Sequence, residues 1–160
     1  MDLAIKKVKV IPKQSKVKID YVLDGDDMAG TYSEPPAPEF YTSLSALNKT
    51  ACEILEMDGA MADRLVPFAV SFSYGANTGV ISASIQSKFE IPMSDTETII
   101  NTPMRKVSIQ YEDGLSIEQC NAIEEFLRNA TEYLKGHRAQ TNLFENPPKD
   151  VTPKPLEIEG

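Results

Sequence analysis

The stretch Lys16-Val17-Lys18-Ile19-Asp20-Tyr21-Val22-Leu23 decides the fold. Apolar side chains at Val17, Ile19 and Tyr21 alternate with polar ones, and successive side chains of a β-strand point to opposite faces, so the stretch predicts a half-buried strand. Residues 3–12 are also rich in β-branched residues, and only residues 13–15 separate the two stretches. We therefore expect the chain to begin with a β-hairpin that has one apolar and one polar face.

Lysines gather on the polar side of this hairpin. If the two strands pair in register, four of them share one face: Lys7, Lys9, Lys16 and Lys18. Such a face is a candidate site for the phosphates of single-stranded nucleic acid, with Tyr21 or Tyr41 stacking on the bases. The alternative is that the lysines only keep an exposed sheet from pairing with other chains.

The composition limits the class of protein. With 160 residues, of which 41% are hydrophobic, the chain is long enough for one core and short for two domains. Its net charge of -8 argues against a surface that is basic overall, although six lysines and one acid occupy its first part, residues 1–18. No apolar run approaches the ~20 residues of a membrane span and no signal peptide is recognisable, so we expect a cytoplasmic protein.

Few residues suit catalysis or metal binding. His137 is the only histidine, and Cys52 and Cys120 fall on the apolar faces of expected helices, which is typical of reduced core thiols. The chain has no nucleophile elbow, phosphate-binding loop or dinucleotide fingerprint. The acidic cluster at residues 24–27 lacks the spacing of a calcium loop and is interpreted as a solvated turn. We expect a binding protein without catalytic residues, metal site or cofactor.

Two stretches have the apolar spacing of helices. Residues 39–57 place apolar side chains at steps of three and four, which lays one stripe along a helix. A second helix is expected to begin at a capping box of Ser116 and Gln119 and to end at Gly136. Residues 139–160 are expected to form an exposed segment and a disordered, acidic, proline-rich tail.

The remaining stretches predict strands and one long loop. Strands are expected at residues 66–74 and 80–91, and a further extended segment at residues 99–110. Residues 24–38 contain glycines and prolines without an apolar period and are expected to form a loop. The order ββαββ(β)α predicts a single α+β domain over residues 1–138, with a mostly antiparallel sheet and two helices packed on one face.

A short motif follows the second helix. Gln140-Thr141-Asn142-Leu143-Phe144 resembles the pentapeptide with which bacterial proteins bind the sliding clamp of DNA replication. The resemblance implies that Gln140 is a polar anchor at the rim of the clamp pocket, and that Leu143 and Phe144 fill its apolar cleft. Thr141 departs from the leucine that is usual there. The alternative is that Leu143 and Phe144 fold back on the sheet or on the preceding helix.

A wider resemblance covers residues 132–140 and continues through Leu143 and Phe144. This segment, together with residues 68–74, resembles small phage and prophage proteins that accompany recombination and replication functions. It implies a non-enzymatic accessory protein of DNA replication or recombination, with a protein partner such as the host sliding clamp. Two alternatives stay open: a single-stranded nucleic-acid-binding helper that uses the lysines, and a host-defence antagonist that occludes a bacterial protein or sequesters a small signalling molecule. The sequence indicates no oligomeric state.

Overall fold

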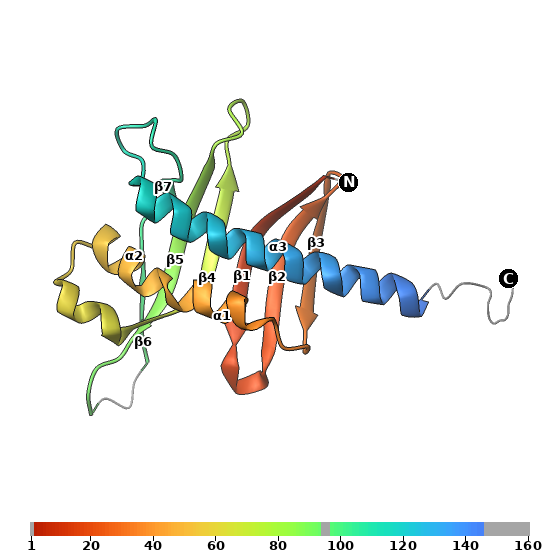
Figure 1. The fold of residues 1–160 in the computed structure, drawn as a ribbon, viewed down its shortest axis with the longest axis horizontal. Helices are drawn as coiled ribbons and strands as arrows, with labels where there is room; N and C mark the ends of the chain where they lie inside the picture. The colour runs from red at the N-terminus through yellow and green to blue at the C-terminus, as the bar shows by residue number, and fades with distance from the viewer. Residues whose placement is uncertain (1, 94–96, 146–160) are drawn as a thin grey trace, which may run out of the picture. The chain divides into compact units, whose positions relative to one another are not determined.

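The computed structural model describes residues 2–93 and 97–145, with side chains described as far as residue 136. In these residues it is a mixed α+β structure whose strands form one antiparallel sheet (Figure 1). The expected fold class and the order ββαββ(β)α are confirmed. The predicted disordered tail falls almost entirely on residues 146–160, which lie outside the described residues.

Seven strands make up the sheet in the described part of the chain. They are β1 (Leu3–Ile11), β2 (Lys16–Leu23), β3 (Asp26–Tyr32), β4 (Leu65–Tyr74), β5 (Ile81–Phe89), β6 (Thr98–Asn101) and β7 (Arg105–Lys106). The strand order is β3-β2-β1-β4-β5-β6, and β7 also pairs with β5. The N-terminal hairpin therefore lies in the sheet beside the central hairpin of β4 and β5.

The hairpin of β1 and β2 forms as the sequence predicts. Its turn is the 3₁₀ helix η1 (Pro12–Gln14), followed by Ser15 with a positive φ of 52°. Val8 pairs with Ile19, and both side chains are completely buried. The apolar alternation read from the sequence is thus the buried face of the hairpin.

The loop expected at residues 24–38 contains the strand β3, so the prediction is wrong for residues 26–32. Asp24 and Gly25 both have positive φ, 50° and 89°, which suits the two-residue turn of a type I′ hairpin. No residue of β3 is buried. Because the strand has no buried face, its sequence lacks the apolar alternation that would indicate it.

Three α-helices accompany the sheet: α1 (Pro38–Ser45), α2 (Leu47–Ile54) and α3 (Ile117–Glu145), with a second 3₁₀ helix, η2 (Gly59–Arg64). The single helix expected at residues 39–57 is thus two helices that meet at Ala46. Ser43 Oγ donates a 3.0 Å hydrogen bond to the carbonyl oxygen of Phe40. Side-chain hydrogen bonds of this kind are typical where helices bend. The break itself falls at Ala46, whose ψ of -18° is closer to that of a 3₁₀ turn than to that of an α-helix.

The start of α3 agrees with the prediction, whereas its end does not. Ser116 Oγ accepts a 3.2 Å hydrogen bond from the N–H of Gln119, and Gln119 Oε1 accepts a 3.0 Å bond from the N–H of Ser116, which is a capping box. The helix continues through Gly136 to Glu145. A glycine inside a helix costs only about 1 kcal/mol relative to alanine, so good helix formers on both sides can carry the helix across it.

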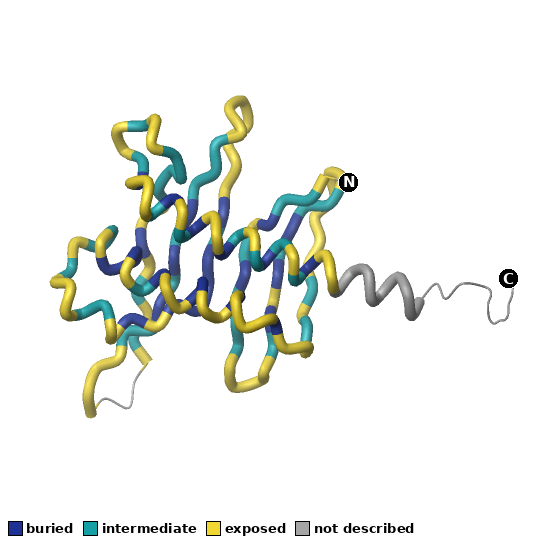
Figure 2. The backbone as a smooth tube through the Cα atoms, viewed as in Figure 1, coloured by how far each residue is buried: buried dark blue, intermediate teal, exposed yellow. Residues whose placement is uncertain are grey.

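The chain divides into two compact units, Met1–Asn129 and Ala130–Gly160, and the boundary falls inside α3. In the first unit, α1, α2 and α3 as far as Asn129 lie on one side of the sheet, and buried residues lie between the layers (Figures 1 and 2). The largest fully buried side chains of this unit are Phe40, Phe126, Ile5, Ile19, Leu47, Ile85, Ile123, Val8, Val17 and Val70. The core therefore sits between the helices and one face of the sheet.

Both cysteines are buried and free, as the sequence indicated. Burial raises the pKa of the Cys52 thiol, and the negative charge of Asp58 raises it further. Burial also raises the pKa of the Cys120 thiol, with a contribution from Glu124. A protonated thiol is a poor nucleophile, so neither residue is a candidate catalytic group.

Candidate functional site

The lysines singled out in the sequence share one face of the sheet. Lys9 lies directly opposite Lys18, and Ile11 lies opposite Lys16. The residues between them in each strand are buried or half-buried under the helices, so the lysines point to the other side. In the first unit, α1, α2 and α3 as far as Asn129 all lie on the opposite side of the sheet (Figure 1). We call this side of the hairpin the lysine face: Lys7, Lys9, Lys16 and Lys18.

A row of mostly polar residues crosses the whole sheet through the lysine face. From β3 to β6 the paired residues are Thr31, Lys18, Lys9, Ala69, Gln86 and Asn101. With neighbouring strands about 4.8 Å apart, this row spans about 24 Å. Gln86 and Asn101 could not be placed in this row from the sequence, because which residues share a row depends on the pairing of distant strands.

Charges on the lysine face are unevenly paired. Lys7 lies opposite Asp20, whereas Lys9 lies opposite Lys18. Like charges directly opposite each other destabilise a sheet. Within the described residues, no carboxylate oxygen lies within 4.0 Å of the ammonium group of any lysine of this face. The Lys9–Lys18 pair is therefore a candidate site for an anion.

A buried aromatic side chain, Phe68, lies beside Lys88. A β-bulge between Pro67 and Ala69 inserts Phe68 as an extra residue of β4. The Nζ atom of Lys88 lies 5.6 Å from the centroid of the Phe68 ring. Lys88 also forms a 3.0 Å ion pair with Glu97, and this hydrogen bond and the charge of Lys88 lower the pKa of the Glu97 carboxyl. The charge of Lys88 is therefore balanced, unlike the charges of Lys9 and Lys18.

The tyrosines considered for base stacking do not join the lysine face. Tyr21 is 3% exposed, because it follows Ile19 by two residues and so points into the core. That prediction is wrong for Tyr21. Tyr41 is 43% exposed but lies on α1, on the helical side of the sheet. A stacking role for Tyr41 beside these lysines is therefore not supported.

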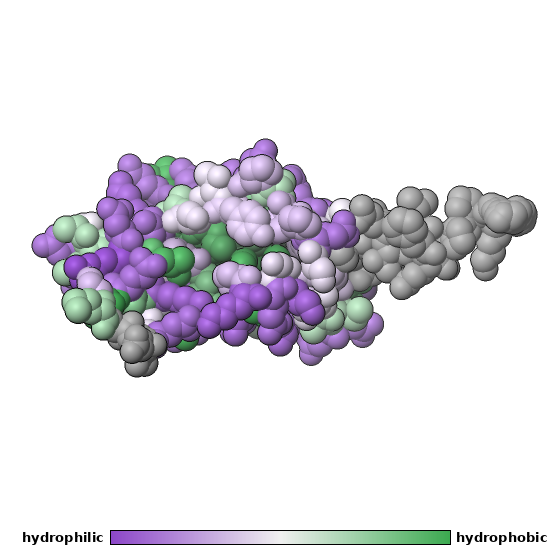
Figure 3. Space-filling model, turned by 90° about the horizontal axis from the view of Figure 1, so that it is seen from below, coloured by the Kyte–Doolittle hydropathy of each residue, from purple (hydrophilic) through white to green (hydrophobic). Residues whose placement is uncertain are grey.

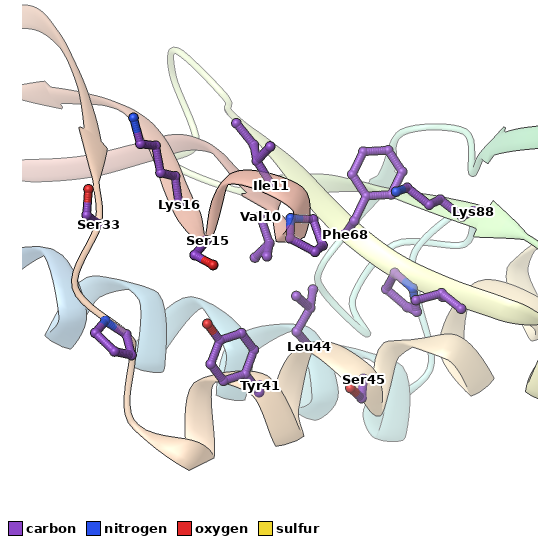
Figure 4. Close-up of a pocket in the computed structure, with 14 residues that line it drawn as sticks. Val10, Ile11, Ser15, Lys16, Ser33, Tyr41, Leu44, Ser45, Phe68 and Lys88 are labelled. Atoms are coloured by element: carbon purple, nitrogen blue, oxygen red, sulfur yellow. The ribbon is translucent and has the colours of Figure 1, made fainter. Parts of the chain in front are cut away.

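A pocket of about 500 Å³ opens between the end of the β1–β2 hairpin and α1. Apolar side chains from the hairpin, α1 and β4 form most of its lining, with Val10, Leu44 and Phe68 among them (Figure 4). Seen from below, apolar surface is visible at the centre of the molecule, with hydrophilic surface around it (Figure 3). The sequence offered no sign of this pocket, because its walls come from segments far apart in the chain.

No family model, curated protein or solved structure matches this chain. Its function is therefore inferred from the geometry. Within residues 2–93 and 97–145, no group of three histidine, cysteine, aspartate or glutamate residues is arranged to hold a metal ion. In the same residues, no helix combines the length and apolarity needed to cross a membrane.

The residues of the C-terminal motif lie near the end of α3, where the backbone is helical. The side chains of Gln140, Leu143 and Phe144 lie outside the described residues, so their partner-binding role stays a prediction. The helical backbone differs from the position after the end of a helix that the sequence indicated. An extended binding mode would therefore require this part of α3 to unwind.

Proposed function

We propose that this chain is a non-enzymatic binding protein whose lysine face binds single-stranded nucleic acid. One observation carries the proposal: Lys9 lies directly opposite Lys18 on the side of the sheet away from the helices. Among the described residues, no carboxylate oxygen lies within 4.0 Å of either ammonium group. A phosphate between two ammonium groups would relieve their repulsion and form charge-assisted hydrogen bonds. The neutral residues Thr31, Gln86 and Asn101 in the same row offer further hydrogen bonds to a nucleic-acid chain.

Apolar residues beside the lysines of this side of the sheet favour binding of a single strand over binding of a duplex. Lys16 pairs with Ile11, and Lys88 pairs with both Val66 and Ile99. Val66 is 41% exposed and Ile99 is 50% exposed, so apolar surface is available next to the lysines. The bases of a single strand are open to such contacts, whereas the bases of a duplex are stacked and paired.

The net charge of -8 is compatible with nucleic-acid binding at one small group of lysines, and it argues against binding through a surface that is basic overall. Negative charge elsewhere repels a polyanion and restricts its approach to the side with lysines. Binding of this kind is weak and depends on salt, because its main source is the release of counterions from phosphates. The salt dependence of binding is thus the most direct measure of the proposed function.

We expect the intact chain to bind a fluorescein-labelled 20-nucleotide strand with an affinity that falls steeply as salt rises. Four lysines on four phosphates correspond to a slope of about -2.8 in a plot of log affinity against log salt. Between about 50 and 200 mM salt the affinity should fall roughly 50-fold. Fluorescence anisotropy measures this directly. Absence of binding at the lowest salt, or binding that does not respond to salt, would refute the proposal.

A protein partner is a second candidate, which the sequence of the C-terminal segment supports. Gln140, Leu143 and Phe144 have the spacing of the sliding-clamp pentapeptide. Burying a leucine and a phenylalanine would contribute roughly 1.5–3 kcal/mol each, before the cost of unwinding and ordering the segment. In this reading the chain is a phage-type accessory factor that brings the clamp and single-stranded nucleic acid together.

Replacing Leu143 and Phe144 together by alanine should abolish capture of the clamp from bacterial lysate and leave the folded unit intact. Bound proteins are read by mass spectrometry, and circular dichroism checks folding. Replacement of Thr141 and Asn142 by alanine is the matched control, because these positions vary in the motif. If the Leu143/Phe144 variant captures the same proteins as the unaltered chain, the partner-binding role of the segment is rejected.

A further inference from the structure

We infer that the pocket between η1 and α1 binds a small apolar molecule that carries an acidic group, such as a fatty acid or an aryl carboxylate. The pocket adjoins the lysine face and shares Lys16 with it, but binding of the small molecule does not require nucleic acid. Its volume of about 500 Å³ lies within the range of roughly 300–1,000 Å³ that is typical of small-molecule sites.

The lining leaves apolar surface in contact with water. Tyr41 is 43% exposed and Val66 is 41% exposed, and both line the pocket. Figure 4 shows Leu44 of α1 and Val10 of β1 directed toward each other across it. An apolar ligand would remove this surface from water, and each buried CH₂ group contributes favourably to binding.

The charge of the pocket is opposite to that of the chain. Its lining contains two lysines, Lys16 and Lys88, and no aspartate or glutamate, whereas the whole chain carries a net charge of -8. Lys88 is paired with Glu97. Lys16 lines the rim with its side chain directed away from Leu44 (Figure 4), and it has no carboxylate partner within the described residues. The pocket therefore has one cation without a carboxylate partner at its outer edge, beside apolar walls.

Hydroxyl groups complete this arrangement. Ser15 follows η1 and adjoins Lys16, while Tyr41 and Ser45 belong to α1 on the opposite wall (Figure 4). A carboxylate at the rim could accept a hydrogen bond from Ser15 and pair with Lys16, while the apolar part of the molecule lies toward Leu44. Apolar walls with a few polar groups that fix orientation are the usual composition of a small-molecule site.

Two fluorescent probes separate the apolar and the ionic part of this inference. Anilinonaphthalene sulfonate is an anion whose sulfonate stands in for the carboxylate, and N-phenylnaphthylamine has nearly the same rings without charge. We expect saturable binding of both probes to the intact chain, with the anion bound more tightly. Replacing Lys16 by glutamine should weaken the anion roughly two- to five-fold and leave the neutral probe unchanged.

A substitution that fills the pocket provides the decisive test. Ser45 lines the pocket and is exposed, so Ser45→Phe should occupy it without disturbing the core. Both probes should then bind at least about tenfold more weakly, which corresponds to the loss of one or two buried CH₂ groups. Thr42→Phe is the matched control, because Thr42 is exposed on the same helix but does not line the pocket.

Several results would overturn the inference. It is wrong if the probes do not saturate, or if Ser45→Phe and Thr42→Phe bind them as the unaltered chain does. It is also wrong if both variants lose binding equally, since the probes would then report a general change of α1. If Lys16→Gln weakens both probes to the same extent, the pocket does not select an acidic group and that part of the inference fails.

Discussion

Replacing Lys9 and Lys18 together by glutamate is expected to weaken binding of a single-stranded oligonucleotide at least about 25-fold in 0.1 M salt. Two lost phosphate contacts account for this factor through the counterions that they no longer release. The salt slope should become shallower by about 1.4. Two glutamates opposite each other also repel the phosphates, so the true loss should exceed this value. Anisotropy titrations at several salt concentrations measure both quantities.

A second double variant controls for net charge. Lys49→Glu with Arg64→Glu changes the charge of the chain by the same amount, at exposed residues of α2 and η2. Because these residues lie outside the lysine face, we expect the affinity to change by less than about threefold at 0.1 M salt, where charges more than about 10 Å apart are largely screened. Equal losses in both variants would mean that binding depends on net charge, and the lysine face would then have no special role.

The lysine face could be predicted because it follows from a local period. Alternation in residues 16–23 determines which side chains of β2 share a side, and the short turn brings β1 beside it. The like-charged pairing of Lys9 with Lys18 depends on the exact register. The bulge between Ile5 and Lys7 changes that register by one residue and has no sign in the sequence.

Phe68 shows how a signal can be present and yet be missed. Proline inside a central strand lacks the N–H that the ladder needs, and so it marks a bulge. Pro67 stands in β4 at the place where the register shifts. The alternation of the following residues favours a regular strand, which hides the bulge. The sequence thus identified the strand but not the residue that the bulge inserts.

The pocket could not be predicted from any local pattern. Its walls combine the end of β1, the segment before α1, α1 itself and the start of β4. The period of each segment predicts the structure of that segment alone, and it does not indicate which segments meet in the fold. The break at Ala46 matters here as well, because it makes α1 a short helix of eight residues that ends beside the pocket.

Replacing Phe126 by alanine is expected to lower the free energy of unfolding by about 3–5 kcal/mol. Phe126 is 0% exposed, and its ring centroid lies 5.3 Å from that of Phe40 on α1. Removing the ring deletes buried apolar surface and leaves a cavity between the helices. Because small domains unfold at a cost of only 5–15 kcal/mol in total, the loss is a large share of the stability. Urea denaturation followed by circular dichroism measures it.

Phe126→Leu is the control variant, because it keeps an apolar residue at this position while removing the aromatic ring. Leucine keeps most of the apolar volume, so its cost should be well below that of alanine. Asn129 donates hydrogen bonds to Ser43 Oγ (3.0 Å) and to the carbonyl oxygen of Glu39 (3.2 Å), which hold α3 against α1 in either variant. If alanine costs less than about 1 kcal/mol, the ring does not support the core.

Since α1 forms one wall of the pocket, the alanine variant should also bind the neutral probe more weakly than the leucine variant does, under conditions in which both are folded.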